Sequence, residues 1–153
     1  MPGDNSKTQL ADALNALLAD SFALYLKTKN FHWHVTGPNF RDYHLMLDEQ
    51  ATAILAITDI IAERVRKNGQ RTLTSIGSIA AKQSITDNDT VGVSAEAMLE
   101  ELRKDNLTLV DAFRAIKPLA ADANDNSTEG LMDDWTDQAE ERAWFLGATL
   151  QKA

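Results

Sequence analysis

The chain has 153 residues, of which 44% are hydrophobic and 25% charged, and its net charge is −8 at pH 7. A chain of this length fits one domain with a core of its own, and the negative charge argues against a nucleic-acid backbone as the main partner. The absence of cysteine excludes disulfides, thiolate zinc sites and iron–sulfur clusters, so histidine and carboxylate side chains are the metal ligands available.

The start of the chain carries no targeting signal that we can identify. It lacks the basic and then apolar stretch of a signal peptide, and no apolar run in the chain approaches the length of a membrane span. We therefore expect a cytoplasmic protein. Residues 1–7 are small and polar, and we expect a short disordered tail there, ahead of one domain over residues 8–153.

Two long helices are predicted in the first half of the chain. Leucines and aromatic residues recur with helical period from residue 8 to about 35. A sharp break follows, because Gly37 and Pro38 end this helix and Asn39 can cap the next. The segment from residue 39 to about 68 has no internal glycine or proline and should form one helix. The short connection predicts an antiparallel hairpin.

A long connection separates this hairpin from the second half of the chain. Residues 69–93 are rich in glycine, serine and threonine, although residues 76–81 could form a short helix packed as a lid. Ser94 then has the position of an N-cap for a third long helix to about residue 121. Pro118 should kink or loosen the last turn of that helix.

The fourth helix is predicted from about residue 127 to 150. Asn126 with Glu129 resembles a capping box at its start. Its apolar positions are Leu131, Trp135, Ala139, Trp144, Phe145 and Leu150. Four long helices, a short extra helix in the crossover between the second and third, and no strand candidate predict an all-α, ferritin-like four-helix bundle.

Five potential metal ligands lie between residues 32 and 63: His32, His44, Asp48, Asp59 and Glu63. His44 and Asp48 are four residues apart, so they share one helix face. Asp59 and Glu63 repeat that spacing. From Asp48 to Asp59 the helix turns by about 1100°, which places them only about 20° apart around the axis but about 16 Å apart along it. Metal–ligand bonds of about 2 Å cannot bridge this distance, so each pair is half a site.

A second copy of the same helix, packed antiparallel about a two-fold axis, would complete both halves and form the site twice. The axis would cross near Ala53 and Ile54, midway between the pairs. His32 would join from the end of the preceding helix. The alternative is that these are ordinary surface carboxylates and satisfied histidines, since a histidine on an apolar helix face is more often a core group. No glutamate has a histidine three residues later, so the intrachain di-iron centre of ferritins is not predicted.

Three blocks of the sequence resemble the Dps miniferritin family. They are residues 29–40 (KNFHWHVTGPNF), 43–50 (YHLMLDEQ) and 59–64 (DIIAER). The likeness extends over essentially the whole chain, including the short lid helix. It implies a hollow homo-dodecamer with ferroxidase centres at its two-fold interfaces. In such a shell Fe(II) is oxidised, preferably with hydrogen peroxide, and the ferric product is stored as a mineral, which protects against oxidative damage.

The resemblance also implies how the ligands are shared. One copy would supply His32, His44 and Asp48, and its partner would supply Asp59 and Glu63. Hard carboxylates favour ferric over ferrous iron, while imidazole retains the incoming Fe(II).

Two residues beside His32 have open roles. Trp33 either scavenges a stray oxidising equivalent or packs as an interface aromatic. His34 stands where many family members have asparagine, and as an extra ligand it would shift the metal preference toward zinc.

An iron-entry pore in this family is often lined by acids in the turn before the last helix. Asp125 matches one such position, but the second is Gly130. Glu129 or Asp122 would then have to supply the remaining charge.

Two other functions remain as alternatives. One is a DNA-binding, compacting starvation protein, but the chain has only Lys7 near one end and Lys152 near the other in place of a lysine-rich tail. A shell of such acidic chains should be repelled by DNA unless divalent ions bridge them, so we expect no direct DNA binding and no nucleoid association. The other alternative is a non-redox zinc or iron buffer.

Overall fold

A computed structural model describes the backbone of residues 2–151 and the side chains of residues 5–151, while Met1 and residues 152–153 lie outside the described part. The elements are α1 (Pro2–His34), α2 (Phe40–Lys67), α3 (Ile76–Lys82), α4 (Ala95–Asp122) and α5 (Asn126–Leu150). No strand occurs among the described residues, so the predicted all-α class is confirmed.

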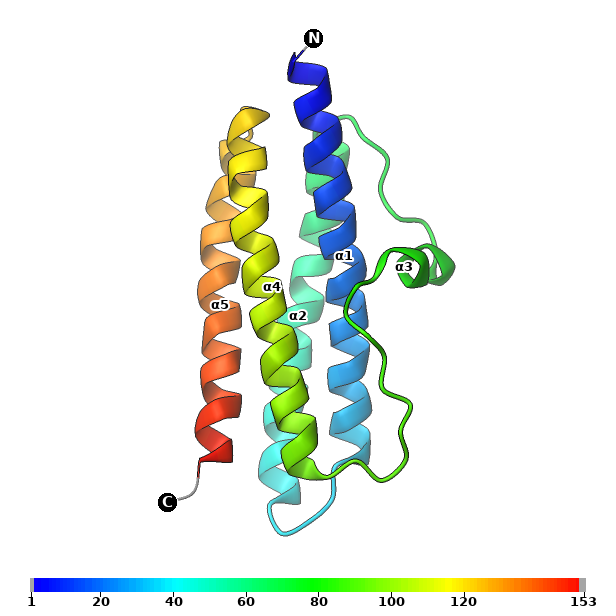
Figure 1. Cartoon of the computed structure of the whole chain (residues 1–153), viewed down its shortest axis with the longest axis vertical. Helices are drawn as coiled ribbons and strands as arrows, with labels where there is room; N and C mark the ends of the chain where they lie inside the picture. Colours follow the sequence, from blue (N-terminus) through cyan, green and yellow to red (C-terminus); the bar gives the residue numbers. More distant parts are fainter. Residues whose placement is uncertain (1, 152–153) are drawn as a thin grey trace.

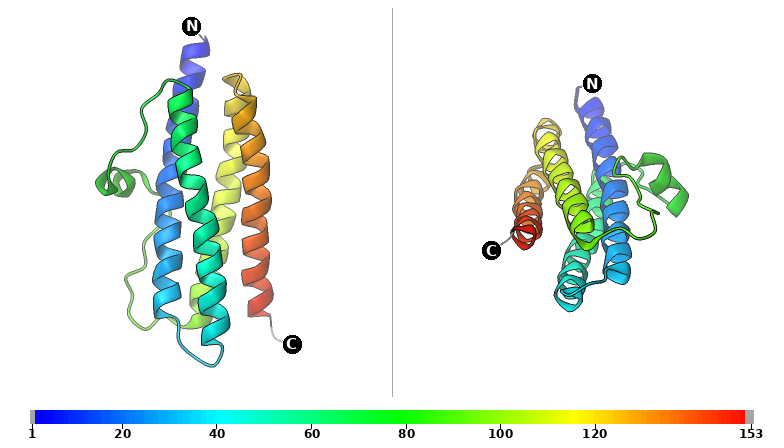
Figure 2. Two further views of the ribbon diagram at one scale, coloured as in Figure 1. Left: turned by 180° about the vertical axis from the view of Figure 1, so that it is seen from behind. Right: turned by 60° about the horizontal axis from the view of Figure 1, so that its bottom comes forward.

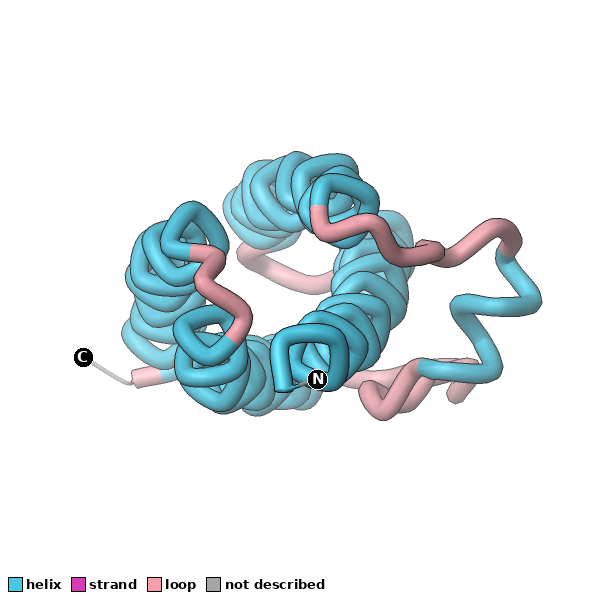
Figure 3. The backbone as a smooth tube through the Cα atoms, turned by 90° about the horizontal axis from the view of Figure 1, so that it is seen from above, coloured by secondary structure: helices cyan, strands magenta, loops and turns pink. Residues whose placement is uncertain are grey.

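The four long helices form one bundle, and α3 stands outside it beside α1 (Figure 1). α1 and α2 run antiparallel, the crossover carries the chain back along the bundle, and α4 and α5 form a second antiparallel pair (Figures 1 and 2). Seen from above, α3 and its flanking loops project from one side of the ring of helices (Figure 3). This is the predicted ferritin-like bundle with its short extra helix. No helix in the described range combines the length and apolar character needed to cross a bilayer.

Helix α1 begins earlier than predicted. Residues 2–7, expected as part of a disordered tail, are helical from Pro2 onward, and Met1 lies outside the described residues. Proline suits the first helical position, because its fixed φ matches the helix and its missing N–H would have no partner there. A helix that tertiary packing already holds extends at low cost through polar residues.

The turn between α1 and α2 lies where the break predicted it. Gly37 has a φ of +117°, in the region that favours glycine. Asn39 occupies the N-cap position of α2, but its side chain makes no capping hydrogen bond. Its amide instead donates to the Tyr43 hydroxyl at 3.4 Å. The glycine rather than the asparagine cap therefore defines this turn.

Of the two predicted N-caps of α4 and α5, the first is confirmed and the second is wrong. The Ser94 hydroxyl accepts from the backbone N–H of Ala97 at 3.1 Å and caps α4 as predicted. At α5 the cap is Asp125, which accepts from the backbone N–H of Thr128. The capping box expected at Asn126 is thus one residue late, because the preceding aspartate takes that role.

The bundle core is built from the apolar faces of the long helices. Its largest fully buried side chains are Phe31, Phe113, Leu10, Leu14, Leu17, Leu18, Leu24, Leu47, Ile54, Ile61, Leu99 and Leu102. A cation also lies in this core, since Arg142 of α5 is only 5% exposed. Its Nε donates to Asn106 Oδ1 of α4 at 2.7 Å. Burial lowers the pKa of Arg142 to about 10, which still leaves it charged at pH 7.

Two buried polar side chains of α1 hold the crossover on either side of α3. The Asn15 amide nitrogen donates to the Arg71 carbonyl at 2.9 Å, and the Asn15 amide oxygen accepts from the Thr72 hydroxyl at 2.8 Å. Asp20 accepts from the backbone N–H and the hydroxyl of Ser84, both at 2.6 Å, and from the N–H of Ile85 at 2.9 Å. Between these anchors, α3 has no buried residue of its own. The flanks of α3 therefore hold it in place more than its packing does.

Replacing Asp20 with alanine should loosen the crossover. Asp20→Ala leaves two backbone N–H groups without an acceptor, so we expect the free energy of unfolding to fall by about 1–3 kcal/mol. Urea denaturation would measure that loss, and amide hydrogen exchange should become faster at Ser84 and Ile85. Asp12→Ala, at an exposed position of the same helix, is the matched control. Equal effects of the two variants would contradict the anchoring role.

Candidate metal centre

The end of α1 and the start of α2 hold His32 and His44 in a reciprocal arrangement. His32 Nδ1 lies 2.6 Å from the carbonyl oxygen of His44, and His44 Nδ1 lies 2.7 Å from the carbonyl oxygen of His32. The two rings stack with their centroids 3.8 Å apart and their planes 13° apart. Phe40 extends the stack, 5.0 Å from the His44 ring. The helical hairpin therefore fixes the orientation of both imidazoles.

This arrangement leaves the second ring nitrogen of each histidine available to another partner. A hydrogen bond to a carbonyl oxygen requires a proton on Nδ1, so Nε2 keeps its lone pair in the neutral ring. Metal-binding histidines are commonly held in this way through their other nitrogen. Asp48 lies beside them, with Oδ1 3.8 Å from His32 Nε2. His32, His44 and Asp48 thus lie together at the end of the hairpin, and their role as one metal half-site remains a prediction.

Lys29 already contacts the carboxylate of this half-site. Its Nζ donates to Asp48 Oδ1 at 2.8 Å, and the same ammonium lies 5.7 Å from the centre of the Trp33 ring. The hydrogen bond from Lys29 lowers the pKa of Asp48, partial burial opposes that shift, and the charge of Lys29 adds to it. The ammonium therefore binds the same carboxylate oxygen that lies 3.8 Å from His32 Nε2. Sequence analysis missed Lys29, although a lysine one helical turn before a candidate ligand was a usable signal.

Asp59 and Glu63 form the second half-site, one turn apart and exposed on α2. A hydrogen bond with Asp59 raises the pKa of Glu63, and the repulsion between their negative charges acts in the same direction. A cation placed between the two carboxylates would relieve that repulsion. The pair therefore has the electrostatics of a cation site without a complete set of ligands.

The structure keeps the two half-sites apart. Asp48 and Asp59 lie on one continuous helix, about 16 Å from each other along its axis. Among the described residues, no three histidine, aspartate or glutamate side chains are arranged to hold one metal ion. Their donors, imidazole nitrogen and carboxylate oxygen, fit iron and also zinc. Within the described part of one chain, neither half-site alone has three ligands so arranged.

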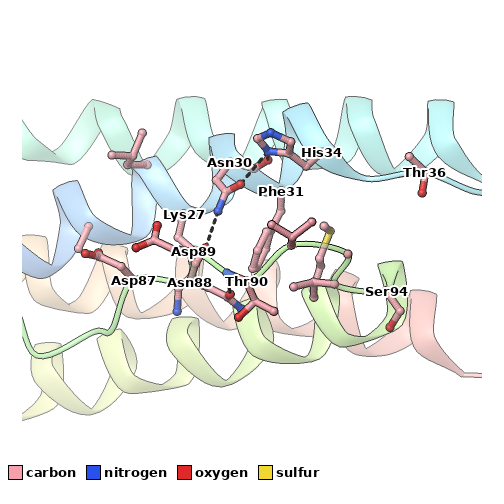
Figure 4. Close-up of a pocket in the computed structure, with 16 residues that line it drawn as sticks. Lys27, Asn30, Phe31, His34, Thr36, Asp87, Asn88, Asp89, Thr90 and Ser94 are labelled. Atoms are coloured by element: carbon pink, nitrogen blue, oxygen red, sulfur yellow. Dashed lines mark hydrogen bonds between the residues drawn. The ribbon is translucent and has the colours of Figure 1, made fainter.

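His34 lies away from this half-site. Its Nδ1 is 2.8 Å from both the backbone and the side-chain oxygen of Asn30, and its ring borders a cavity of about 830 Å³ between α1 and the end of the crossover. Figure 4 shows His34 and Asn30 on α1, with Asn88 and Asp89 of the crossover across the cavity. A single chain therefore does not bring His34 to His32 as an extra ligand, because two residues along a helix turn the side chain by about 200°.

The carboxylate of Asp125, which was expected to line a pore, forms hydrogen bonds with other side chains of the same chain. It is 6% exposed and accepts hydrogen bonds from the side chains of Arg64, Asn68 and Thr128. Burial acts to raise its pKa, but the hydrogen bonds from Arg64, Thr128 and Asn68 outweigh it and lower the pKa to about 2. This carboxylate therefore caps α5 and links it to α2.

The other acids of this turn are more open. Asp122 is exposed and Glu129 is partly exposed, whereas Gly130 offers no side chain. An entry pore would form between copies, so its assignment to Asp125, Glu129 and Asp122 remains a prediction.

The sequence matches the ferritin-like domain family over residues 11–153. A "DNA protection during starvation protein" of Brevibacillus brevis is 32% identical over 142 residues, which cover 93% of this chain and 95% of the relative. The Dps structure from Thermosynechococcus elongatus has a TM-score of 0.95 over 100% of this chain and 97% of that one, and at 24% identity it supports the fold alone.

A second solved structure has a chemical description in its name. The Dps protein from Vibrio cholerae O1 is described as a member of a broad superfamily of ferritin-like diiron-carboxylate proteins. It has a TM-score of 0.90 and 28% identity, and the match covers 96% of this chain and 92% of that one.

The Asp125 ion pair should make the stability sensitive to acid. Its pKa is about 2 in the fold and about 3.9 in an unfolded chain. The charged carboxylate therefore stabilises the fold by about 2–3 kcal/mol at neutral pH, and this contribution is lost as the pH falls from about 4 toward 2. Asp125→Asn should lower the free energy of unfolding by that amount at neutral pH, and by progressively less in acid.

Urea denaturation at neutral pH and near pH 3 would measure this difference. Asp133→Asn is the control, because Asp133 pairs with Lys117 at 2.7 Å on the surface and should contribute less than about 1 kcal/mol at either pH. A loss in Asp125→Asn that does not change with pH would show that the carboxylate charge is not the stabilising factor.

Proposed function

Because the chain belongs to the Dps family of ferritin-like proteins, we propose that it is a ferroxidase and iron-storage protein whose metal centres form between two copies. Iron storage and protection against oxidative damage are the general role that membership supports. The finer proposal is that Fe(II) is oxidised at the two-fold interface, preferably with hydrogen peroxide. We further propose that twelve copies enclose a shell in which the ferric product is stored.

The observation that carries this proposal is the pair of incomplete half-sites on one face of α2. If two copies pack their α2 helices antiparallel, Asp48 of one copy faces Asp59 of the other. The same register sets His44 against Glu63. Imidazoles and carboxylates then surround one position from two sides, and the two-fold axis repeats the arrangement.

The donor set suits the proposed chemistry. His32 and His44 are held with Nε2 available, so they can retain ferrous iron, while Asp48, Asp59 and Glu63 stabilise the ferric product. Two Fe(II) ions each give up one electron, and one hydrogen peroxide takes both electrons with two protons to form two water molecules. Consuming peroxide in this two-electron step avoids the release of hydroxyl radicals.

The alternatives receive less support from the geometry. Zinc fits the same donors, but His34 is held by Asn30 on another face of α1 and adds no third imidazole within one chain. The name of the Brevibacillus relative refers to DNA protection, yet a net charge of −8 per chain opposes contact with phosphates. We therefore propose no direct DNA contact.

Two complementary variants would test whether the centre is shared. The first, His44→Ala with Asp48→Ala, removes one half-site, and the second, Asp59→Ala with Glu63→Ala, removes the other. Each alone should lose iron oxidation. When equal amounts are refolded together, half of the pairs are mixed and each mixed pair has one intact site. Peroxide-driven Fe(II) oxidation should then recover to about one quarter of the wild-type rate.

The control is a single chain with His44→Ala and Asp59→Ala together, which should lose both sites and gain nothing on mixing with itself. Cobalt binding measured in parallel would report occupied sites independently of oxidation. Full activity of either double variant alone would place the site within one chain, and a mixture without recovery would remove the shared centre.

Lys29 should compete with the metal for Asp48. Lys29→Met removes the ammonium that donates to this carboxylate, so we expect about two- to fivefold tighter binding of Co(II), a redox-inactive probe. Isothermal titration would measure the dissociation constant. Lys104→Met, on the exposed surface of α4, should leave the constant unchanged. Weaker binding in Lys29→Met would mean that Lys29 positions the carboxylate for the metal instead of competing with it.

A further inference from the structure

We propose that in the two-fold pair the indole ring of Trp33 from one copy enters a hollow beside Asp59 of the other, beneath α3. This inference rests on the proposed function, because it starts from the pairing of the two half-sites. It names the contact that would hold the pair together, and it assigns a role to α3.

The hollow lies between α1, α2 and α3 and has a volume of about 420 Å³, greater than that of any amino-acid side chain. Phe22, Ala62, Ile76 and Ile79 are among the residues that line it, as is Asp59. Ile76 is 85% exposed and α3 buries no residue in the single chain. An apolar hollow of this kind, under a helix with no buried residue, favours an apolar side chain from outside.

Trp33 has the complementary properties. It is 57% exposed on the single chain, directly after the candidate ligand His32. Its ring lies 5.7 Å from the ammonium of Lys29, which in turn donates to Asp48 at 2.8 Å. Trp33, Lys29 and Asp48 therefore form one cluster at the edge of the half-site. Whatever meets Asp48 across the interface also comes close to the indole ring.

The register of the pair brings this cluster to the hollow. Pairing of the half-sites sets Asp48 against Asp59, so the indole, one turn beyond Lys29 on α1, lies near the level of residues 59–63 of the other copy. The two-fold axis turns the partner end for end. It leaves the α1 helices of both copies on the same flank of the α2 pair. The end of one α1 thus faces the side of the other copy where α3 covers the hollow.

A buried tryptophan in such a pocket is the type of residue that dominates the affinity of an interface. It would also cover the metal centre from one side and limit the access of water to it. The crossover anchors at Asn15 and Asp20 would then hold α3 in position to receive the ring.

Cross-linking would test the contact directly, because the chain has no cysteine of its own. One chain would carry Trp33→Cys and another Ile79→Cys, and the two would be refolded together and treated with a short bis-maleimide. Since each chain has one thiol, a product that joins the two chains must be intermolecular. We expect at least about tenfold more of this product than from a mixture of Trp144→Cys and Ile79→Cys chains.

A second measurement covers the case in which the cysteine variants assemble poorly. A chain with Trp135→Phe and Trp144→Phe keeps Trp33 as its single tryptophan, and acrylamide should quench its fluorescence less in the assembled protein than in dissociated chains. Equal quenching in both states would overturn the inference.

The outcomes separate this inference from the proposed function. If cross-linking matches the control while the complementary half-site variants still restore oxidation, the Trp33 contact is wrong and the shared centre stands. If cross-linking is strong but the variants restore nothing, the contact is supported and the metal centre is not where we place it.

Discussion

The candidate centre depends on one constraint, the unbroken backbone of α2. Its 28 residues contain no glycine or proline, so the helical hydrogen bonds keep the ligands at set distances and on one face. Leu47, Ile54 and Ile61 are buried in the core on a neighbouring face of the helix, which prevents rotation about its axis. Because the rod neither bends nor turns, the two half-sites cannot approach each other within a chain. The case for a second molecule follows from this stiffness.

Much of the fold could be predicted from the sequence because its signals are local. Helical period, the break at Gly37 and the cap at Ser94 each involve residues within a few positions of one another, and the structure has them where predicted. The grouping within each half-site was also predictable, since a spacing of four residues sets two side chains on the same face of any helix. His32 lies next to His44 because the connection between α1 and α2 is short.

The features that escaped prediction depend on contacts between distant parts of the chain. Asp125 and Asn126 are equally good caps by type, and Arg64 of α2 favours the aspartate through an ion pair that no local pattern reveals. Trp144 was expected on the apolar face of α5 but is 66% exposed, whereas Arg142 is buried nearby because Asn106 accepts its hydrogen bond. In both cases a hydrogen-bonding partner on another helix stabilises the residue that is buried, Asp125 in the first case and Arg142 in the second.

The mutual hydrogen bonds between His32 and His44 have a further consequence for any metal bound there. Each ring is tied to the backbone of the opposite helix, so the ends of α1 and α2 cannot separate without turning both imidazoles away. An ion bound at Nε2 would therefore resist fraying of the hairpin, and fraying would release the ion. By thermodynamic linkage, binding of the ion and closure of the α1–α2 hairpin are coupled. Each stabilises the other by the same free energy.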